Sequence, residues 1–307
     1  MNRPKHSHRF LTGLGVASAC WLALGALPAS ALTATDHLLL SGPDREVLPS
    51  ATDTWLAWSE NSRSEPRHFS VYVRRRGGDV RRRLNPAGTR AYSGGFDGDR
   101  FVFQQVSGSN QSDLRIYDLA QHRYLPVPHG VDTAKWEWAP SLSGDYLLFT
   151  RNTFRRTTYT ARVVLHRAST GHEWILGTFR GRYQDGVAEA GQVSGDYAVW
   201  TVCPMDQDCD VFRYTISTGT TTKMPDHKQE YAPSVAADGT VFFMRSGPPC
   251  GAHAKLIRYA SGVGETVRSF ARNRDAFDTY AVSSTDVVHE IANCRTNDID
   301  VNEVTIT

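Results

Sequence analysis

The sequence predicts an all-β fold, and more specifically a six-bladed β-propeller. The stretch SGDYLLF at residues 143–149 returns as SGDYAVW at residues 194–200. Sliding the chain along itself superposes six positions at intervals of 43 to 51 residues, namely Trp58, Phe103, Phe149, Trp200, Phe243 and Glu290. Each copy is a tight polar turn followed by a short apolar strand. A unit of about 40–50 residues that consists only of strands is typical of a propeller blade.

The first 31 residues are predicted to be a secretory signal peptide, and residues 32–307 a single propeller domain. Arg3, Lys5 and Arg9 form a basic start, and residues 10–27 that follow are apolar and almost uncharged. Three small residues then fit a cleavage site. We therefore expect a secreted protein that is extracellular or associated with the cell envelope.

Two alternatives to a cleaved signal peptide remain open. A retained membrane anchor is disfavoured because the apolar run is short and interrupted by Gly and Ser. A lipoprotein modified at Cys20 is disfavoured because the hydrophobic run continues past this cysteine. No other stretch of the sequence is apolar and long enough to span a membrane.

The charge balance argues against nucleic-acid binding. The chain holds 34 Lys and Arg against 32 Asp and Glu, and the predicted signal peptide removes three bases and no acids. The mature part then carries a formal charge of −1, whereas nucleic-acid-binding proteins present a basic surface to the phosphates. We expect a monomer.

The four cysteines of the mature part are expected to form two disulfides, because an even number in an exported protein is typical of a disulfide framework. Cys203 and Cys209 flank one loop and are expected to bridge it. Cys250 and Cys294 fall in equivalent loops of successive repeats, so their bridge would tie blade five to blade six. Four reduced, buried cysteines are the alternative, and their spacing does not resemble a zinc site.

The mature chain reads as short strands separated by Gly, Pro, Asn, Asp and Ser. Strict alternation in LRIY at residues 114–117 predicts a strand with one buried face. The expected strands of blades one to five cover residues 46–50, 55–58, 69–75 and 80–84; 100–103, 114–119 and 123–125; 146–150, 161–166 and 173–176; 197–202, 210–215 and 220–224; and 240–244, 255–259 and 265–269.

Blade six is incomplete at the end of the chain. Residues 287–291 and 299–305 supply two strands, and then the chain stops. We expect residues 37–40, from the other end of the mature chain, to add the missing outer strand. Such a closure pairs an otherwise open sheet edge and holds the ring together.

The repeat resembles that of TolB-type propellers. The segments APSLSGDYLLF (residues 139–149) and APSVAADGTVFF (residues 232–243) are similar to a pattern of Pro, then Ser-Pro-Asp-Gly, then an apolar strand. The Pro of Ser-Pro-Asp-Gly is absent here. The resemblance covers residues 37–307 and implies a six-bladed propeller. It leaves function open, because binding proteins, peptidases and lyases share this repeat.

A ring of acidic residues is predicted at the mouth of the central channel. The innermost strand of each blade is expected to begin 11 to 13 residues before the aligned position. The residues found there are Glu46, Glu137, Glu189, Glu230 and Asp278, with Arg90 beside the place in blade two and Trp138 and Tyr231 nearby. Five carboxylates around one axis would make a negative funnel for a cation, a sugar or a basic peptide. The alternative is that these acids cap strand ends and bind water.

Two further charge patterns are ambiguous. Alternate acids over residues 206–210, and more weakly over residues 297–300, are reminiscent of calcium ligands, but the glycine and final glutamate of a calcium loop are missing. We therefore expect no cofactor. Arg74-Arg75-Arg76 and Arg81-Arg82-Arg83 flank a Gly-Gly-Asp turn. This basic hairpin either binds an anionic polymer or lipid headgroup, or keeps an exposed outer strand soluble.

No catalytic motif of a hydrolase, metalloprotease or phosphate-binding enzyme occurs in the mature chain. The sequence therefore favours a secreted, non-catalytic propeller that binds a protein or cell-envelope partner, with glycan as a further class of ligand. The alternative is a carbohydrate-active enzyme, a glycoside hydrolase or polysaccharide lyase, that uses two carboxylates of the channel mouth.

Overall fold

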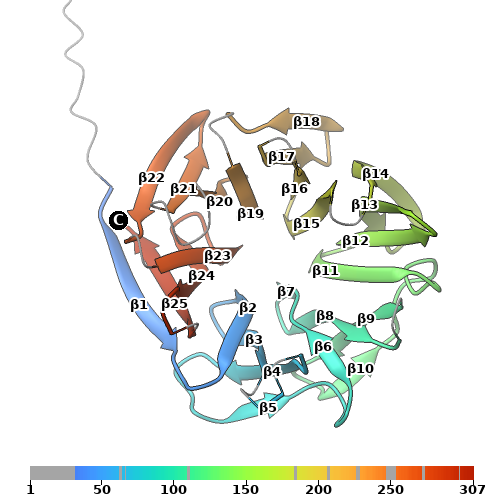
Figure 1. The fold of residues 1–307 in the computed structure, drawn as a ribbon, viewed down its shortest axis with the longest axis horizontal. Coiled ribbons are helices and arrows are strands. Elements are labelled where there is room, and N and C mark those ends of the chain that lie inside the picture. Colours follow the sequence, from blue (N-terminus) through green and yellow to red (C-terminus); the bar gives the residue numbers. More distant parts are fainter. Residues whose placement is uncertain are drawn as a thin grey trace, which may run out of the picture. The chain divides into compact units, whose positions relative to one another are not determined.

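Strands account for nearly all of the regular structure (Figure 1). The computed structural model describes residues 32–61, 64–65, 67–108, 111–182, 185–205, 208–225, 229–246, 254–271, 274–296 and 298–307. Residues 32–307 form one unit. The described part of the chain contains no helix that is long and apolar enough to cross a bilayer.

Antiparallel pairing sorts the described strands into six sets, which we call blades one to six. Blade one holds β2 (Arg45–Ala51), β3 (Trp55–Asn61), β4 (Ser70–Arg75) and β5 (Arg81–Arg83). Blade two holds β6 (Arg90–Tyr92), β7 (Phe96–Asp97), β8 (Arg100–Val106), β9 (Ser112–Asp118) and β10 (Arg123–Leu125). Blade three holds β11 (Trp136–Ser143), β12 (Tyr146–Arg155), β13 (Thr158–Arg167) and β14 (His172–Gly181).

Blade four holds β15 (Gly186–Ser194), β16 (Tyr197–Pro204), β17 (Asp210–Thr215) and β18 (Thr220–Lys223). Blade five holds β19 (Gln229–Val235), β20 (Val241–Ser246), β21 (Lys255–Ala260) and β22 (Val263–Ser269). Blade six holds β23 (Arg274–Ala281), β24 (Asp286–Asn293), β25 (Ile299–Ile306) and β1 (Ala34–Leu40). Figure 1 shows the sets arranged in a ring, with β2, β11, β15, β19 and β23 nearest its centre.

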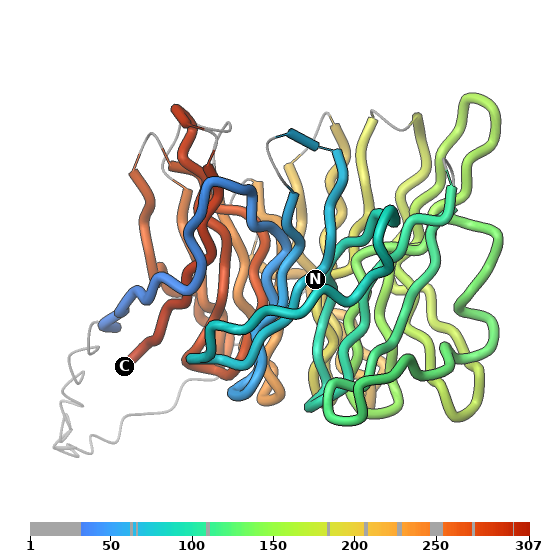
Figure 2. The backbone as a smooth tube through the Cα atoms, turned by 90° about the horizontal axis from the view of Figure 1, so that it is seen from below, coloured from blue at the N-terminus to red at the C-terminus, as the bar shows by residue number. Residues whose placement is uncertain are grey.

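The front of the described chain completes the last blade, as the sequence predicted. Strand β1 pairs antiparallel with β25, from Ala34 opposite Ile306 to Leu40 opposite Val301. Two backbone hydrogen bonds between Thr33 and Thr307 extend this ladder, at 3.1 and 2.9 Å. The strand is longer than the four residues expected. Figures 1 and 2 both show β1 running along the outside of β25, so the open edge of blade six is covered.

A bulge interrupts the innermost strand of five blades. The pairing register shifts between Val47 and Ser50 in β2, and at the corresponding places of β11, β15, β19 and β23. In three of them the residue before a proline is left-handed, with φ of 54° at Leu48 and 49° at both Ala139 and Ala232. Proline is tolerated there because the ladder is already broken and no backbone donor is lost. The bulges direct backbone and side chains of successive blades toward the axis.

Neighbouring blades approach closely at these bulges. A Cβ atom on Gly191, in the bulge of β15, would lie 2.1 Å from the carbonyl oxygen of Pro233 in β19. Only glycine fits this contact between blades four and five. Farther from the axis the blades are held by apolar clusters, such as the one in which Trp200 stacks on Phe212 with ring centroids 5.3 Å apart.

The pairing register corrects the repeat alignment in blades four and six. Trp58, Phe149 and Phe243 lie opposite the bulge of their blade, whereas in blade four the equivalent residue is Val199. Trp200 and Glu290 lie one residue beyond this position. The repeat had been aligned on its bulky residues, and this concealed the one-residue shift in blades four and six. A shift of one residue places a side chain on the opposite face of its strand.

Candidate functional site in the central channel

Four glutamates occupy equivalent places in the inner strands, two residues before the left-handed or glycine position of the bulge. They are Glu46, Glu137, Glu189 and Glu230. The residue directly opposite each of them on the second strand of the blade differs: Glu60, Arg151, Thr201 and Arg245, respectively. This single cross-strand neighbour determines the environment of each acid.

In blade three the acid is paired with a buried cation. Glu137 is fully buried, and the Arg151 Nε donates to its carboxylate at 3.0 Å. Thr133 donates to the same oxygen, and Arg151 also binds Glu173 at 2.9 Å. Burial nevertheless raises the pKa of Glu137, and the Thr133 and Arg151 contacts only partly oppose this effect. The Glu137 carboxylate therefore stabilises the blade through these contacts and is not a free charge in the channel.

In blade five Glu230 is held in the same way. It is buried, and the Arg245 Nε and Nη2 both donate to its Oε1, at 3.0 and 2.6 Å. The Arg245 guanidinium lies 5.6 Å from the ring centroid of Phe243, within the limit of about 6 Å for a cation–π contact. This acid also does not face the channel as a free charge.

In blade one the opposite residue is itself an acid. Burial, and then repulsion by Glu60, raise the pKa of Glu46 to about 7. Glu60 accepts a hydrogen bond from the Trp58 Nε1 at 3.1 Å and forms an ion pair with Arg81. Arg81 therefore binds Glu60, and Glu46 has no cation among its described contacts.

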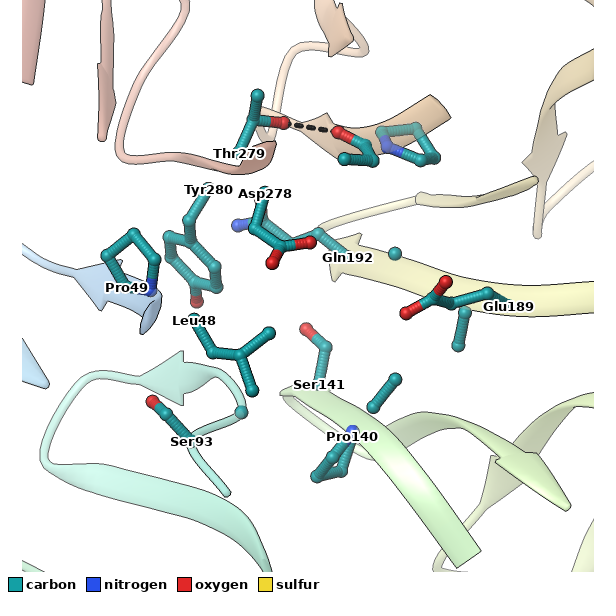
Figure 3. Close-up of a pocket in the computed structure, with 16 residues that line it drawn as sticks. Leu48, Pro49, Ser93, Pro140, Ser141, Glu189, Gln192, Asp278, Thr279 and Tyr280 are labelled. Atoms are coloured by element: carbon teal, nitrogen blue, oxygen red, sulfur yellow. Dashed lines mark hydrogen bonds between the residues drawn. The ribbon is translucent and has the colours of Figure 1, made fainter. Parts of the chain in front are cut away.

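In blade four the acid faces the channel. Glu189 has the neutral Thr201 opposite it, and burial together with the nearby Asp278 raises its pKa to about 8. Asp278 lies in the bulge of β23 rather than at the glutamate position, which Ala276 occupies in blade six. Figure 3 shows the carboxyl groups of Glu189 and Asp278 turned toward the same space.

A third acid, Glu290 in the second strand of blade six, contacts Asp278. Glu290 in β24 is buried, and burial and the Asp278 charge raise its pKa well above its ordinary range. Glu290 and Asp278 share a side-chain hydrogen bond, and the Glu290 Oε1 accepts another from the Leu48 backbone N–H. Burial raises the pKa of Asp278 as well. Near neutral pH this trio holds more protons than three exposed acids would.

The space between these acids is small. A cavity of about 80 Å³ is lined by residues of the bulges and by Glu189 and Asp278. Gln192 bridges blades four and six, donating to the Ala281 carbonyl and accepting from its N–H, both at 2.9 Å. The Tyr280 hydroxyl bridges blades six and two through the Phe96 N–H at 2.8 Å. Figure 3 shows both side chains at the edge of this space.

The remaining predicted residues lie around this centre. Arg90 precedes the equivalent position in blade two, where the buried Ala91 lies opposite Gln105. Trp138 is half-buried and its Nε1 is buried without a hydrogen-bond partner among the described atoms. The Tyr231 hydroxyl donates to the Ala276 carbonyl at 3.1 Å. The structure thus joins Glu189 with Asp278 and separates the other three acids from them.

The disulfide prediction is supported for the first loop, where Cys203 and Cys209 are bonded. Cys294 is also disulfide-bonded, and its expected partner Cys250 lies outside the described residues. Parts of both calcium-like segments, residues 206–207 and 297, lie outside them too. Among the described residues, no group of three or more His, Cys, Asp or Glu side chains is arranged to hold a metal ion.

Sequence reasoning missed Glu290 and Gln192 as parts of the channel, whereas Tyr280 was expected close to the acidic ring and does line the cavity. Glu290 was aligned with core aromatics, although an acid in that position already indicated a special environment. Gln192 takes the place that proline occupies in the bulges of β2, β11 and β19. That departure from the repeat was the available signal for a residue with a different role.

Comparison with known proteins gives the fold. No family model matches the chain, and no curated protein matches it. Among solved structures, a putative TolB from Agrobacterium tumefaciens superposes with a TM-score of 0.54 at 11% identity, covering 90% of this chain and 98% of that one. TolB from Acinetobacter baumannii gives 0.52 at 11% identity and covers 83% of this chain, which spans 64% of that protein.

A peptidase propeller is similar to the same extent. Pyrococcus horikoshii acylaminoacyl peptidase superposes with a TM-score of 0.51 at 12% identity, covering 81% of this chain but 43% of the peptidase. Likeness at such identities concerns architecture only. The residues from 32 to 307 therefore have a TolB-like β-propeller fold.

Proposed function

We propose that this chain is an exported, non-catalytic propeller that binds a protein or cell-envelope partner through the loops at the mouth of its channel. The observation that carries this proposal is the state of the channel acids. Glu137 and Glu230 are buried against arginines, and Glu189 and Asp278 face a cavity of about 80 Å³. The channel centre acts as a structural plug, so recognition takes place on the surface around it.

The size of the cavity argues against sugar chemistry at these acids. Pockets that bind small molecules usually enclose about 300–1,000 Å³. A space of about 80 Å³ is too small for a pyranose ring and its attacking water.

The loop-bearing end of the ring offers the surface for a partner. The β12–β13 hairpin extends beyond its neighbours at this end (Figure 2). Phe154, near its tip, is 43% exposed, and Arg155 and Arg156 beside it are exposed as well. Met205, in the loop after β16, is 69% exposed. Exposed aromatic, Met and Arg side chains are enriched in protein interfaces.

Export supports an envelope or extracellular partner. The predicted signal peptide and the disulfide between Cys203 and Cys209 both fit an oxidising compartment. Two of the similar structures are TolB proteins, whose propeller has the same architecture at 11% identity. The proposed class of partner therefore rests on the oxidising compartment and on the exposed loop residues, and not on sequence similarity to TolB.

The proposal is tested by crosslinking and mass spectrometry on envelope extracts of the producing cells. We expect the wild-type chain to be crosslinked to a defined set of components, and a Phe154→Asp/Met205→Asp variant to lose them. Val263→Asp, at the first residue of β22, which is 58% exposed, is the matched control and should retain them. Equal capture by both variants, or no specific capture by the wild type, would refute the proposal.

A glycan-cleavage assay tests the alternative, a carbohydrate-active enzyme. Glu189 lines the cavity, and its pKa of about 8 favours the protonated form that a general acid requires near neutral pH. We expect no product from a panel of polysaccharides. Product formation that disappears in Glu189→Gln would show that the channel is catalytic.

A further inference from the structure

The basic hairpin of blade one contains six arginines, and most of them are already engaged. Arg76 pairs with Glu303, and Arg81 pairs with Glu60. Arg74 donates to the Leu39 carbonyl at 2.7 Å, and Arg83 donates to the Pro86 carbonyl at 3.1 Å. The contacts of Arg76 and Arg74 connect the hairpin to blade six, and those of Arg81 and Arg83 are local to blade one. Structural contacts therefore account for these four arginines without a ligand.

Arg75 and Arg82 are different. Both are exposed, and neither forms an ion pair with a carboxylate in the described part of the chain. The Arg75 guanidinium lies 4.9 Å from the ring centroid of Trp55. Arg82 donates to the Nδ1 of His122 and lies 3.5 Å from the Tyr117 hydroxyl. Each cation is thus held in place by a neutral partner, and its charge is not neutralised.

These two arginines line one cavity. It measures about 290 Å³ and lies between the β4–β5 hairpin of blade one and the turn after β9 in blade two, neighbouring sets in Figure 1. Trp55, Val73 and Leu119 form an apolar wall. Arg75, Arg82 and a single acidic residue, Asp79, also line the cavity, as does Arg74, whose guanidinium is however bound to the Leu39 carbonyl.

His122 adds a donor to this set. An arginine has no acceptor, so the Nδ1 that Arg82 contacts carries the lone pair and the Nε2 of the neutral ring carries the hydrogen. The cavity therefore combines cationic forks, a ring N–H and an apolar wall. Arginine forks match the oxygen geometry of phosphate and bind it with strong, charge-assisted hydrogen bonds.

We propose that this cavity binds the phosphate group of an organic ligand, with Arg75 and Arg82 on the phosphate and the Trp55 wall against the ligand's body. The volume of about 290 Å³ is at the lower end of small-molecule pockets, which suits a headgroup or a single phosphorylated sugar. The source of the phosphate is either a membrane lipid or a soluble phosphate ester.

Calorimetry with inorganic phosphate and with glycerol phosphate tests the shared chemistry. We expect the wild-type chain to bind both, and Arg75→Gln/Arg82→Gln to bind roughly tenfold more weakly or worse. The control, Arg180→Gln/Arg295→Gln, removes two exposed charges from other blades and should change affinity by less than about twofold. Asp79→Asn removes the one carboxylate of the cavity and should strengthen binding.

Vesicle sedimentation separates the two sources. Vesicles of phosphatidylcholine with phosphatidylglycerol should retain the protein if a lipid headgroup is the ligand, and pure phosphatidylcholine vesicles should not. A soluble ester is the ligand if glycerol phosphate binds but neither vesicle does. The proposal fails if the wild type binds none of these probes, or if the double variant and its control lose affinity equally. Circular dichroism and thermal melting confirm that each variant is folded.

Discussion

Glu230 and Glu189 occupy the same place in neighbouring blades, yet only one of them is part of a salt bridge. Glu230 lies opposite Arg245, which donates two hydrogen bonds to its carboxylate. Glu189 lies opposite Thr201, and its pKa is raised to about 8. One cross-strand residue thus decides whether an inner-strand acid is paired with a cation or faces the channel without one. An acid in the channel is therefore not by itself evidence of a negative funnel.

The largest expected effect comes from breaking a paired acid. Arg151→Met should lower the free energy of unfolding by about 3–5 kcal/mol, because it leaves the fully buried Glu137 without its cation. Urea denaturation at pH 7 measures this. The exposed Arg180→Met should change stability by less than about 0.5 kcal/mol. A loss below about 1 kcal/mol in Arg151→Met would show that the pair is not a structural element.

A smaller effect is expected from the bridge across the channel. Tyr280→Phe removes the acceptor of the Phe96 N–H, which is then buried without a partner. Stability should fall by about 1–3 kcal/mol. Amide hydrogen exchange should show faster opening at residue 96 than in the wild type. Unchanged exchange there would mean that the bridge does not hold blades two and six together.

The unpaired acid should show itself in the dependence of stability on pH. Glu189 binds its proton more tightly in the folded state, with a pKa of about 8, than in the unfolded chain. Folding therefore takes up a proton between about pH 4.5 and 8, and stability falls as pH rises through this window. Below it, both states are protonated and the penalty vanishes.

Glu189→Gln removes this proton and should flatten the profile. Relative to the wild type, the variant should gain about 1–2 kcal/mol between pH 5 and pH 8, less than the full shift implies because water enters the cavity. Thermal melts across that range measure the difference. Parallel profiles of the two proteins would show that Glu189 is already ionised at pH 5.

Glu46→Gln sharpens the comparison with a third environment. The pKa of Glu46 is raised to about 7, through burial and the neighbouring Glu60. The same flattening should occur with a smaller amplitude, about 1 kcal/mol, and should be complete by pH 7 rather than pH 8. Melts of the variant and the wild type at pH 5, 6, 7 and 8 test this, and a gain that continues from pH 7 to pH 8 would contradict the order of the two acids.

The fold was predictable because it depends on features that repeat. The turn-and-strand stretches at residues 143–149 and 194–200 recur at blade spacing, and the apolar residues 37–40 had only one open edge to cover. The pairing of β1 with β25 confirms that closure. Position along the chain was enough for these predictions, since every blade contributes the same local pattern.

The site was predictable only in part. The acids could be found by counting back from each strand, and four of them are indeed equivalent. Their cross-strand neighbours could not be predicted. Whether Arg151 or Thr201 lies opposite an acid depends on the exact register of a bulged strand pair. Asp278 appeared equivalent to the glutamates because blade six was aligned on Glu290, whereas the pairing places Asp278 in the bulge, two residues beyond the equivalent Ala276.

Carboxyl-carbon NMR, with glutamate labelled at its side-chain carbon, tests the central claim most directly. The Glu189 resonance, assigned by its loss in Glu189→Gln, should titrate with a midpoint near the pKa of about 8. The result that would contradict the account is a Glu189 carboxyl that is fully ionised at pH 6, which would make the channel a charged binding site instead of a neutral plug.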